Sequence, residues 1–191
     1  MTQTDGVISA ERYATSATVV VPSRTEPLKE AALRELGGNV LVRGRNITEA
    51  CAVAVELARQ GNFTYLEDGD DSWLMAGAST ALWEMLELEP ELDAVIVPVG
   101  GGNLLAGALL AAAALRRNVA VLGVQSAAAP GVTESWISGK IVVKECTTLA
   151  SGPATERPGA LALAVMNALL ERMKRRARRT AKSGRDQVAR S

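Results

Sequence analysis

Short apolar runs alternate with longer amphipathic segments along most of the chain. β-branched residues dominate the runs at 17–22, 39–42, 94–99 and 119–124, and this pattern predicts buried strands. The segments between them carry apolar residues three and four positions apart and predict helices. Regular alternation of strand and helix is typical of parallel sheets joined by right-handed crossovers. The sequence therefore predicts an α/β fold, with open parallel sheets and flanking helices.

Capping signals set the predicted ends of the helices. Asn46, followed three residues later by Glu49, resembles a capping box and begins a helix that runs to about Gln60. The acidic stretch at 67–71 supplies a cap and first-turn acids for a helix over 73–88. We interpret these acids as caps because they lack the spacing of an EF-hand. Further helices are predicted over residues 25–36, 103–116, 130–139 and 158–173, and weaker strands over residues 63–66 and 141–143.

Composition narrows the classes of protein that remain. Apolar residues make up 48% of the chain and aromatics 3%, so the core must consist mainly of Ala, Val and Leu, and the tryptophans are expected at core positions of helices. The chain has no histidine, which excludes Ser-His-Asp and Cys-His nucleophilic sites and histidine-ligated zinc. Cys51 and Cys146 stand apart from any partner and favour a reduced, cytoplasmic protein, with no metal site.

Charge is distributed unevenly along the chain. Residues 1–171 carry 12 Lys and Arg against 20 Asp and Glu, whereas residues 172–191 carry 9 basic residues and one acid. The basic tail suggests nucleic acid or an anionic surface as one hypothesis, but no aromatic residues interleave the charges. We therefore interpret it as a disordered, solvated tail and expect no nucleic-acid partner. The longest apolar run, 104–115, is too short to span a membrane.

Gly100, Gly101 and Gly102 lie between a predicted strand and a predicted helix. In open parallel sheets ligands bind at this place, and backbone N–H groups at a helix start attract anions, phosphate above all. The run is not a dinucleotide fingerprint, because position 105 is leucine, and it lacks the Gly-Lys pair of a Walker loop. The alternative is that the glycines only permit a tight turn.

The stretch "VIVPVGGGNLLAG", with "TTLASGPATERPG" further on, resembles the glycine-loop half of fold-type II pyridoxal-phosphate enzymes, specifically the serine/threonine dehydratases. This resemblance implies pyridoxal 5'-phosphate as the cofactor and an amino acid as the substrate. It implies that the main chain of Gly100, Gly101, Gly102 and Asn103 binds the cofactor phosphate, with Asn103 where many members have a fourth glycine. It also places Gly152 beside the cofactor ring, after a serine that replaces the family's acid.

The resemblance divides the chain into predicted domains. Residues 1–15 form an irregular N-terminus, 16–67 a partial small domain, 68–173 a partial large domain with the glycine loop, and 174–191 the basic tail. Missing strands would leave sheet edges exposed, so self-association through these edges is a further expectation.

The chemistry of the resembled family needs a lysine that forms a Schiff base with the cofactor, in a Ser-x-Lys type motif. The family carries this motif well before the small domain, and no lysine precedes the predicted small domain here; the lysines of the sequence are Lys29, Lys140, Lys144, Lys174 and Lys182. We interpret all of them as solvated surface residues, so we assign no catalytic residue. We expect an incomplete lyase chain, truncated at both ends. The alternatives are a non-catalytic phosphate-binding module and an inert remnant.

Overall fold

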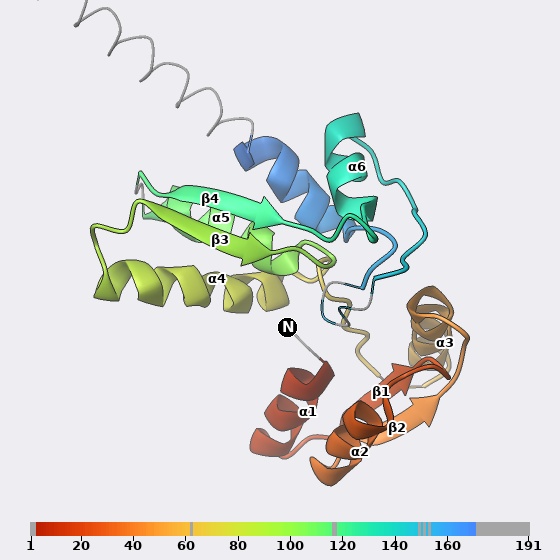
Figure 1. The fold of residues 1–191 in the computed structure, drawn as a ribbon. Coiled ribbons are helices and arrows are strands. Elements are labelled where there is room, and N and C mark those ends of the chain that lie inside the picture. The colour runs from red at the N-terminus through yellow and green to blue at the C-terminus, as the bar shows by residue number, and fades with distance from the viewer. Residues whose placement is uncertain are drawn as a thin grey trace, which may run out of the picture. The chain divides into compact units, whose positions relative to one another are not determined.

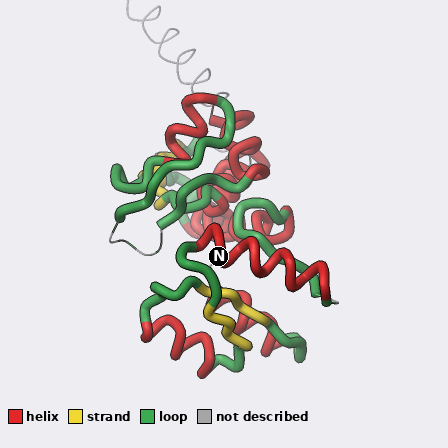
Figure 2. Tube along the Cα trace, turned by 90° about the vertical axis from the view of Figure 1, so that its right-hand side faces the viewer, coloured by secondary structure: helices red, strands yellow, loops and turns green. Residues whose placement is uncertain are grey.

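The structure, a computed structural model, describes residues 3–61, 63–115, 118–148, 150, 152 and 154–170. The chain divides into two compact units, residues 1–66 and 67–191, and each is described by itself (Figure 1). Each unit holds one pair of short strands flanked by helices, as the yellow and red segments of Figure 2 show. The predicted basic tail at 174–191 lies outside the described residues.

The first unit contains three helices and two strands among its described residues: α1 (Gln3–Arg12), β1 (Thr18–Val21), α2 (Pro27–Glu35), β2 (Asn39–Val42) and α3 (Ile47–Gln60). β1 and β2 pair in parallel, with Val20 opposite Leu41. The predicted cap of α3 is confirmed, because Asn46 Oδ1 accepts a hydrogen bond of 2.9 Å from the Glu49 N–H. Glu49 in turn accepts a bond from the Arg45 N–H at 2.8 Å, one residue earlier than a capping box requires.

The prediction of an irregular N-terminus at 1–15 is wrong, because α1 is a helix. Val7 is 2% exposed and packs in one buried cluster with Val21, Leu33 and Val40. Gly6 lowers the intrinsic helix propensity of this segment, so the sequence pattern does not indicate a helix there. Tertiary packing of one apolar residue against a core can form a helix that propensity alone does not predict.

The second unit places helices beside a second parallel pair of strands. Its elements are α4 (Ser72–Leu88), β3 (Ala94–Pro98), α5 (Asn103–Ala114), β4 (Ala120–Val124), α6 (Gly131–Ser138) and a helical run over 160–170. β3 and β4 pair in parallel with Val97 opposite Gly123. α5 lies behind the two strands in Figure 1, and α4 packs against α5. The strands predicted at 63–66 and 141–143 are wrong: neither segment pairs with a described strand, and an apolar run without a partner is not a strand.

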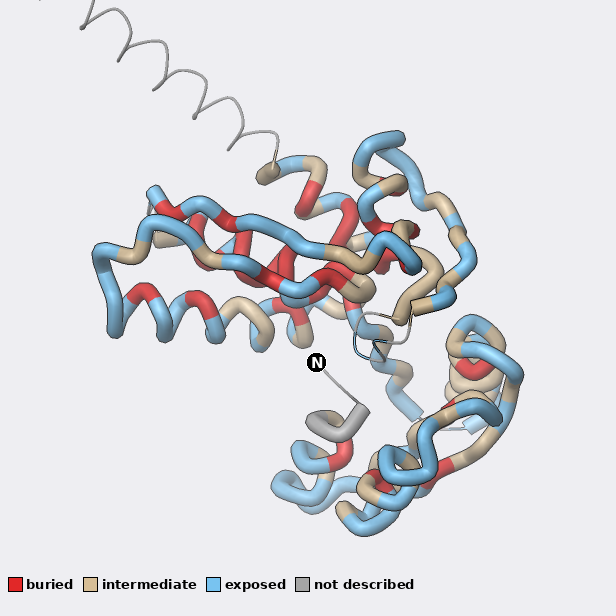
Figure 3. Tube along the Cα trace, in the orientation of Figure 1, coloured by how far each residue is buried: buried red, intermediate tan, exposed pale blue. Residues whose placement is uncertain are grey.

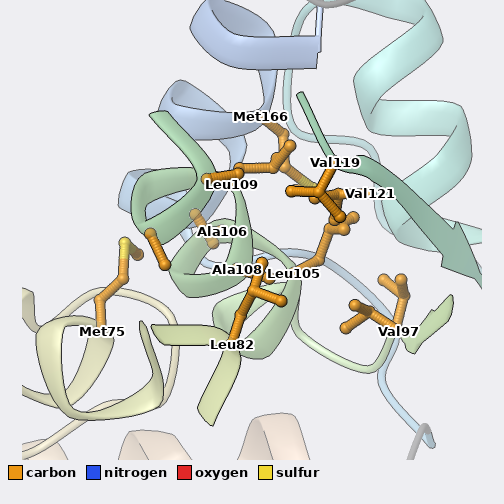
Figure 4. Close-up of a cluster of buried hydrophobic side chains, with 14 of the residues drawn as sticks. Met75, Leu82, Val97, Leu105, Ala106, Ala108, Leu109, Val119, Val121 and Met166 are labelled. Atoms are coloured by element: carbon orange, nitrogen blue, oxygen red, sulfur yellow. The ribbon is translucent and has the colours of Figure 1, made fainter. Parts of the chain in front are cut away.

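The core of the second unit surrounds α5. This helix is apolar on all sides, and side chains from α4, the strands and the run over 160–170 cover it (Figure 4). The strands alternate instead: Val97 and Val121 belong to this core, whereas Ile96 and Leu122 are 68% and 52% exposed on the outer face. Figure 3 colours the chain by burial. The tryptophan prediction is wrong for Trp73 and Trp83, which are 85% and 39% exposed, while Trp136 packs against the core. No described helix is long and apolar enough to cross a membrane.

α4 and α5 approach each other closely at Gly107. A Cβ atom built there would lie 2.8 Å from the Ser79 nitrogen and 2.9 Å from the Ala78 carbonyl carbon. Gly77, in the interior of α4, would by contrast meet nothing within 4 Å. The two helix-interior glycines therefore differ in what they contribute to packing.

We predict that Gly77→Ala and Gly107→Ala change stability in opposite directions. Gly77→Ala should raise the free energy of unfolding by ~0.5–1 kcal/mol, because alanine restricts the unfolded chain and nothing obstructs its methyl group. Gly107→Ala should lower it by about 1–3 kcal/mol, because the new methyl pushes α4 away from α5. Urea denaturation of both variants measures this pair, and equal effects of the two substitutions would contradict the close helix contact.

Candidate functional site

The glycine run connects the carboxyl end of β3 to the start of α5. Val99 continues the strand ladder by donating to the Val124 carbonyl at 2.8 Å, so the loops that follow β3 and β4 lie side by side. The first bond within α5 runs from the Ala106 N–H to the Gly102 carbonyl at 2.9 Å. The N–H groups of residues 103–105 thus have no acceptor within the helix, and no side chain caps them. A helix start of this kind attracts an anion.

Gly102 and Gly101 have different roles in the loop. Gly102 has φ +97°, and a Cβ atom on it would lie 3.0 Å from Met166 Cε and 3.3 Å from Ala162 Cβ. Both its conformation and its packing therefore require glycine. A Cβ atom on Gly101 would meet only the Asp68 carbonyl oxygen at 3.8 Å. The absence of a side chain at Gly101 leaves room for a ligand to approach the backbone.

Three backbone segments meet behind this loop. The Gly159 N–H donates to the Gly101 carbonyl at 3.0 Å, and the Ala162 N–H donates to the Gly69 carbonyl at 2.9 Å. A Cβ atom on Gly159 would lie 2.4 Å from the Gly69 carbonyl carbon, so only glycine allows this approach. Because the C=O and N–H of a trans peptide unit point in opposite directions, the Gly102 N–H points away from Gly159. The junction fixes the loop and leaves its N–H groups for a ligand.

The acidic stretch before α4 has structural roles; the predicted cap of α4 is confirmed for Asp71, but the predicted first-turn acids are wrong, because the first turn of α4 has none. Asp71 Oδ1 accepts from the Trp73 and Leu74 N–H groups at 2.8 and 2.9 Å and caps α4. Asp70 Oδ1 accepts from the Leu161 N–H at 2.9 Å, at the start of the run over 160–170. Glu67 forms an ion pair of 3.1 Å with Arg157. Within the described part of the chain, no group of His, Cys, Asp and Glu side chains is placed to hold a metal ion.

Asn103, the first residue of α5, is 2% exposed, and its side-chain amide interacts with the Asp68 carboxyl without forming a hydrogen bond of good geometry. Burial raises the pKa of the neighbouring Asp68 carboxyl, although the residue as a whole is exposed, and the Asn103 amide opposes this shift. Ser135 is the other buried polar residue among those described, and it is satisfied: its Oγ donates to the Gly131 carbonyl and accepts from the Val142 N–H. Gln125 Nε2 and Thr155 Oγ1 lack partners.

The structure brings together four of the five residues that the resemblance assigned to cofactor binding, because Gly100 to Asn103 form one continuous loop and helix start. Gly152 is exposed with open space around it, and its place beside a cofactor stays a prediction. Sequence reasoning missed Gly69 and Gly159, since a single glycine in "DGD" or "RPG" indicates only an ordinary turn. Their only signal was their place near predicted helix starts: Gly69 precedes the helix predicted over 73–88, and Gly159 lies in the first turn of the one predicted over 158–173.

None of the described lysines lies in the core. Lys29 and Lys140 are exposed, and Lys144 Nζ forms an ion pair of 2.8 Å with Glu134. Lys174 and Lys182 lie outside the described residues. None of the described lysines is buried, and none belongs to the loop at 100–103, so the site assigned here consists of binding groups.

Comparison with known proteins links this geometry to a family. The sequence profile described as "Pyridoxal-phosphate dependent enzyme" matches residues 8–191. L-threonine ammonia-lyase of Geobacter sulfurreducens is 36% identical over 164 residues, which are 85% of this chain and 41% of that protein. The solved structure of processed threonine deaminase isoform 2 from Solanum lycopersicum matches with a TM-score of 0.80 at 29% identity, covering 88% of this chain and 50% of that one.

A second solved structure, a fungal L-serine ammonia-lyase from Rhizomucor miehei, matches with a TM-score of 0.74 at 26% identity. The match covers 84% of this chain and 52% of that chain. The chain therefore spans about half the length of these solved relatives and 41% of the curated one.

We predict that alanine at two adjacent loop positions has unequal effects. Gly102→Ala should lower the free energy of unfolding by about 1–2 kcal/mol, because alanine disfavours positive φ, and the contact with Met166 adds to this cost. Gly101→Ala should leave stability within about 0.5 kcal/mol of the original chain, because its methyl group enters open space. Thermal or urea unfolding measures both, and a Gly102→Ala variant as stable as Gly101→Ala would contradict the loop conformation.

Proposed function

Because the chain belongs to the pyridoxal-phosphate dependent enzyme family, we propose that it is part of an amino-acid ammonia-lyase of the serine/threonine dehydratase type. The resemblance to fold-type II enzymes that the sequence indicated is confirmed, and so is the α/β class with parallel sheets. The assignment to hydroxy amino acids is supported by 36% identity to an L-threonine ammonia-lyase. The observation that carries the proposal is the loop at 100–103, with unpaired N–H groups and open space at Gly101.

The residues present fit the phosphate group of the cofactor. The loop offers main-chain N–H donors at the electropositive start of α5, and the Asn103 N–H is one of them. Gly101 carries no side chain that would hold a phosphate away from these donors. When bound, pyridoxal phosphate supplies an electron sink for reactions at the α-carbon of amino acids. The role of Gly100, Gly101, Gly102 and Asn103 is to bind and orient it.

A second candidate function is a phosphate-binding module without chemistry of its own. The loop, the start of α4 and the start of the run over 160–170 all belong to the second unit and hold one another through Gly69, Gly101 and Gly159. Binding therefore needs no residue from the first unit to shape the loop. Pyridoxal phosphate binding without release of a 2-oxo acid from threonine or serine would support this second function; release of the 2-oxo acid would support the lyase.

Self-association and a cytoplasmic location are part of the same proposal. Ile96, Leu122 and Val124 are 68%, 52% and 57% exposed on the outer face of the β3–β4 pair. Parallel sheets are normally covered on both faces, so this apolar surface favours association. Sedimentation of the purified chain at several concentrations measures it directly.

We predict that a negative charge at Gly101 abolishes cofactor binding, whereas a neutral side chain of the same shape weakens it less. Gly101→Asp should bind pyridoxal phosphate at least about tenfold more weakly than Gly101→Asn, because the carboxylate repels the phosphate at close range. Equilibrium dialysis against pyridoxal phosphate measures both variants beside the original chain.

The two variants control for each other, since aspartate and asparagine fill the same space. Equal affinities of Gly101→Asp and Gly101→Asn, with circular dichroism showing both folded, would place the phosphate elsewhere. No measurable binding to the original chain would end the proposal itself.

A further inference from the structure

The carboxyl end of α4 presents apolar side chains that no described element covers. Trp83, Met85 and Leu88 are 39%, 46% and 80% exposed, whereas Leu82 and Leu86 on the other side of the same turns are 2% and 1% exposed. A single apolar residue at a surface is ordinary. Three of them within two turns of one helix form a face that a partner can cover.

Exposed carboxylates accompany these apolar side chains, and we call residues 83–93 the acidic end of α4. Its acids are Glu84, Glu87, Glu89, Glu91 and Asp93. The sequence has no Lys or Arg between Arg59 and Arg116, and none of the five acids forms an ion pair with a described residue. The last turn of α4 contains no basic residue either, so these carboxylates oppose the helix dipole without compensation. A cationic partner would remove this unfavourable interaction.

Arginine is the side chain whose chemistry fits this surface. Its apolar stem covers apolar groups, its planar head stacks on aromatic rings, and the same head pairs with carboxylates. The acidic end of α4 offers the two kinds of group side by side: Trp83 Nε1 donates to Glu87 Oε1 at 2.9 Å, and Leu88 lies one helical turn from Glu84. A segment rich in arginine would therefore satisfy both the apolar and the charged groups.

The chain itself contains such a segment. Residues 172–191 carry nine basic residues and one acid, and seven of the nine are arginine. Residues 1–171 carry 12 basic residues against 20 acids. The charge of +8 in the last part of the chain is thus equal and opposite to the charge of −8 in the rest. This complementarity identifies the chain's own basic tail as the occupant.

The tail is long enough to reach the acidic end of α4 within one chain. α4 and the helical run over 160–170 both begin at the Gly69–Gly159 junction and lead away from it (Figure 1). The backbone path from Leu170 through this junction to Leu88 bounds the separation of these two residues at about 50 Å. The chain that follows Leu170 spans up to about 70 Å when extended. Intramolecular docking is therefore geometrically possible whatever the directions of the two helices.

We propose that the basic tail, residues 174–191, docks on the acidic end of α4 of the same chain. Arginine guanidinium groups pair with the carboxylates there, and the arginine stems cover Trp83, Met85 and Leu88. This inference stands apart from the proposed function, because neither the loop at 100–103 nor pyridoxal phosphate takes part in it. It replaces the sequence-based expectation of a solvated tail with a defined intramolecular contact.

Carbodiimide cross-linking of the full chain tests the contact, because this reagent joins a lysine amine only to a carboxylate in direct contact with it. Equal amounts of unlabelled and ¹⁵N-labelled chain are mixed and cross-linked, and the products are identified by mass spectrometry. Lys174 or Lys182 should be joined to a carboxylate of residues 84–93, with both partners in the same isotopic form. The yield should fall by about fivefold or more at high salt, which screens exposed charges.

A pair of variants supplies the matched control. The double variant Glu84→Gln, Glu89→Gln removes two acids of the docking surface, and the double variant Glu35→Gln, Glu145→Gln removes two exposed acids outside it that likewise form no ion pair with a described residue. Trypsin cleaves a docked tail only when it is released, so the first variant should lose its tail about fivefold faster than the original chain. The second should lose it at the original rate.

Three results would overturn the inference: no cross-link between the tail and residues 84–93; cross-links only between chains of different isotopic form, which would make a second copy the occupant; or equal rates of tail cleavage in the two double variants. None of these measurements involves pyridoxal phosphate. Failure of the docking contact and failure of the proposed function are therefore distinguishable.

Discussion

The close approach of the backbone at Gly159 to the backbone at Gly69 is the constraint on which the site depends. With no side chain on either residue, the start of α4 and the start of the run over 160–170 come close enough for their main chains to touch. The Gly101 carbonyl joins the same junction by accepting from Gly159, so the glycine loop is anchored on one side only. The opposite side, where N–H groups emerge, is the one available to an anion. The hydrogen bonds that hold the loop carbonyls in place also set the direction of the loop N–H groups, because C=O and N–H belong to the same rigid peptide units. One set of bonds therefore makes the loop rigid and leaves its N–H groups exposed.

Two amide side chains lie at the same edge of the β3–β4 sheet. Asn103 begins the helix after β3, with its amide against the Asp68 carboxyl, and Gln125 directly follows β4 with a buried amide nitrogen that has no partner. Among the described residues of the same unit, Ser135 has both a donor and an acceptor, whereas Thr155 Oγ1 lacks a partner. Selection for folding stability alone would favour, at such buried positions, apolar groups or polar groups with hydrogen-bond partners. Both residues lie at the carboxyl edge of the parallel strands, where α/β sheets bind ligands.

The sequence predicted those parts of the fold whose signal is local. The four strands and most helices carry periodic apolar residues, and Asn46 and Asp71 mark the starts of their helices. α1 was missed because its formation depends on Val7 meeting a distant core, and the strand over 63–66 was wrongly predicted because no described strand pairs with it. The glycine loop was predicted from three adjacent glycines, yet the junction behind it was not. Nothing in the residues around Gly69 indicates that Gly159, far along the chain, will lie against it.

Asp70 and Asp71 are neighbours in the chain, yet they cap two different helices. One peptide unit therefore sets the spacing between the beginnings of α4 and of the helical run over 160–170. A single-residue insertion between these aspartates could satisfy one helix only by withdrawing the carboxylate from the other. Insertions and deletions in natural or designed relatives should thus be tolerated before Glu67 or after Leu88. The spacing between Asp70 and Asp71 cannot change without uncapping one of the two helices.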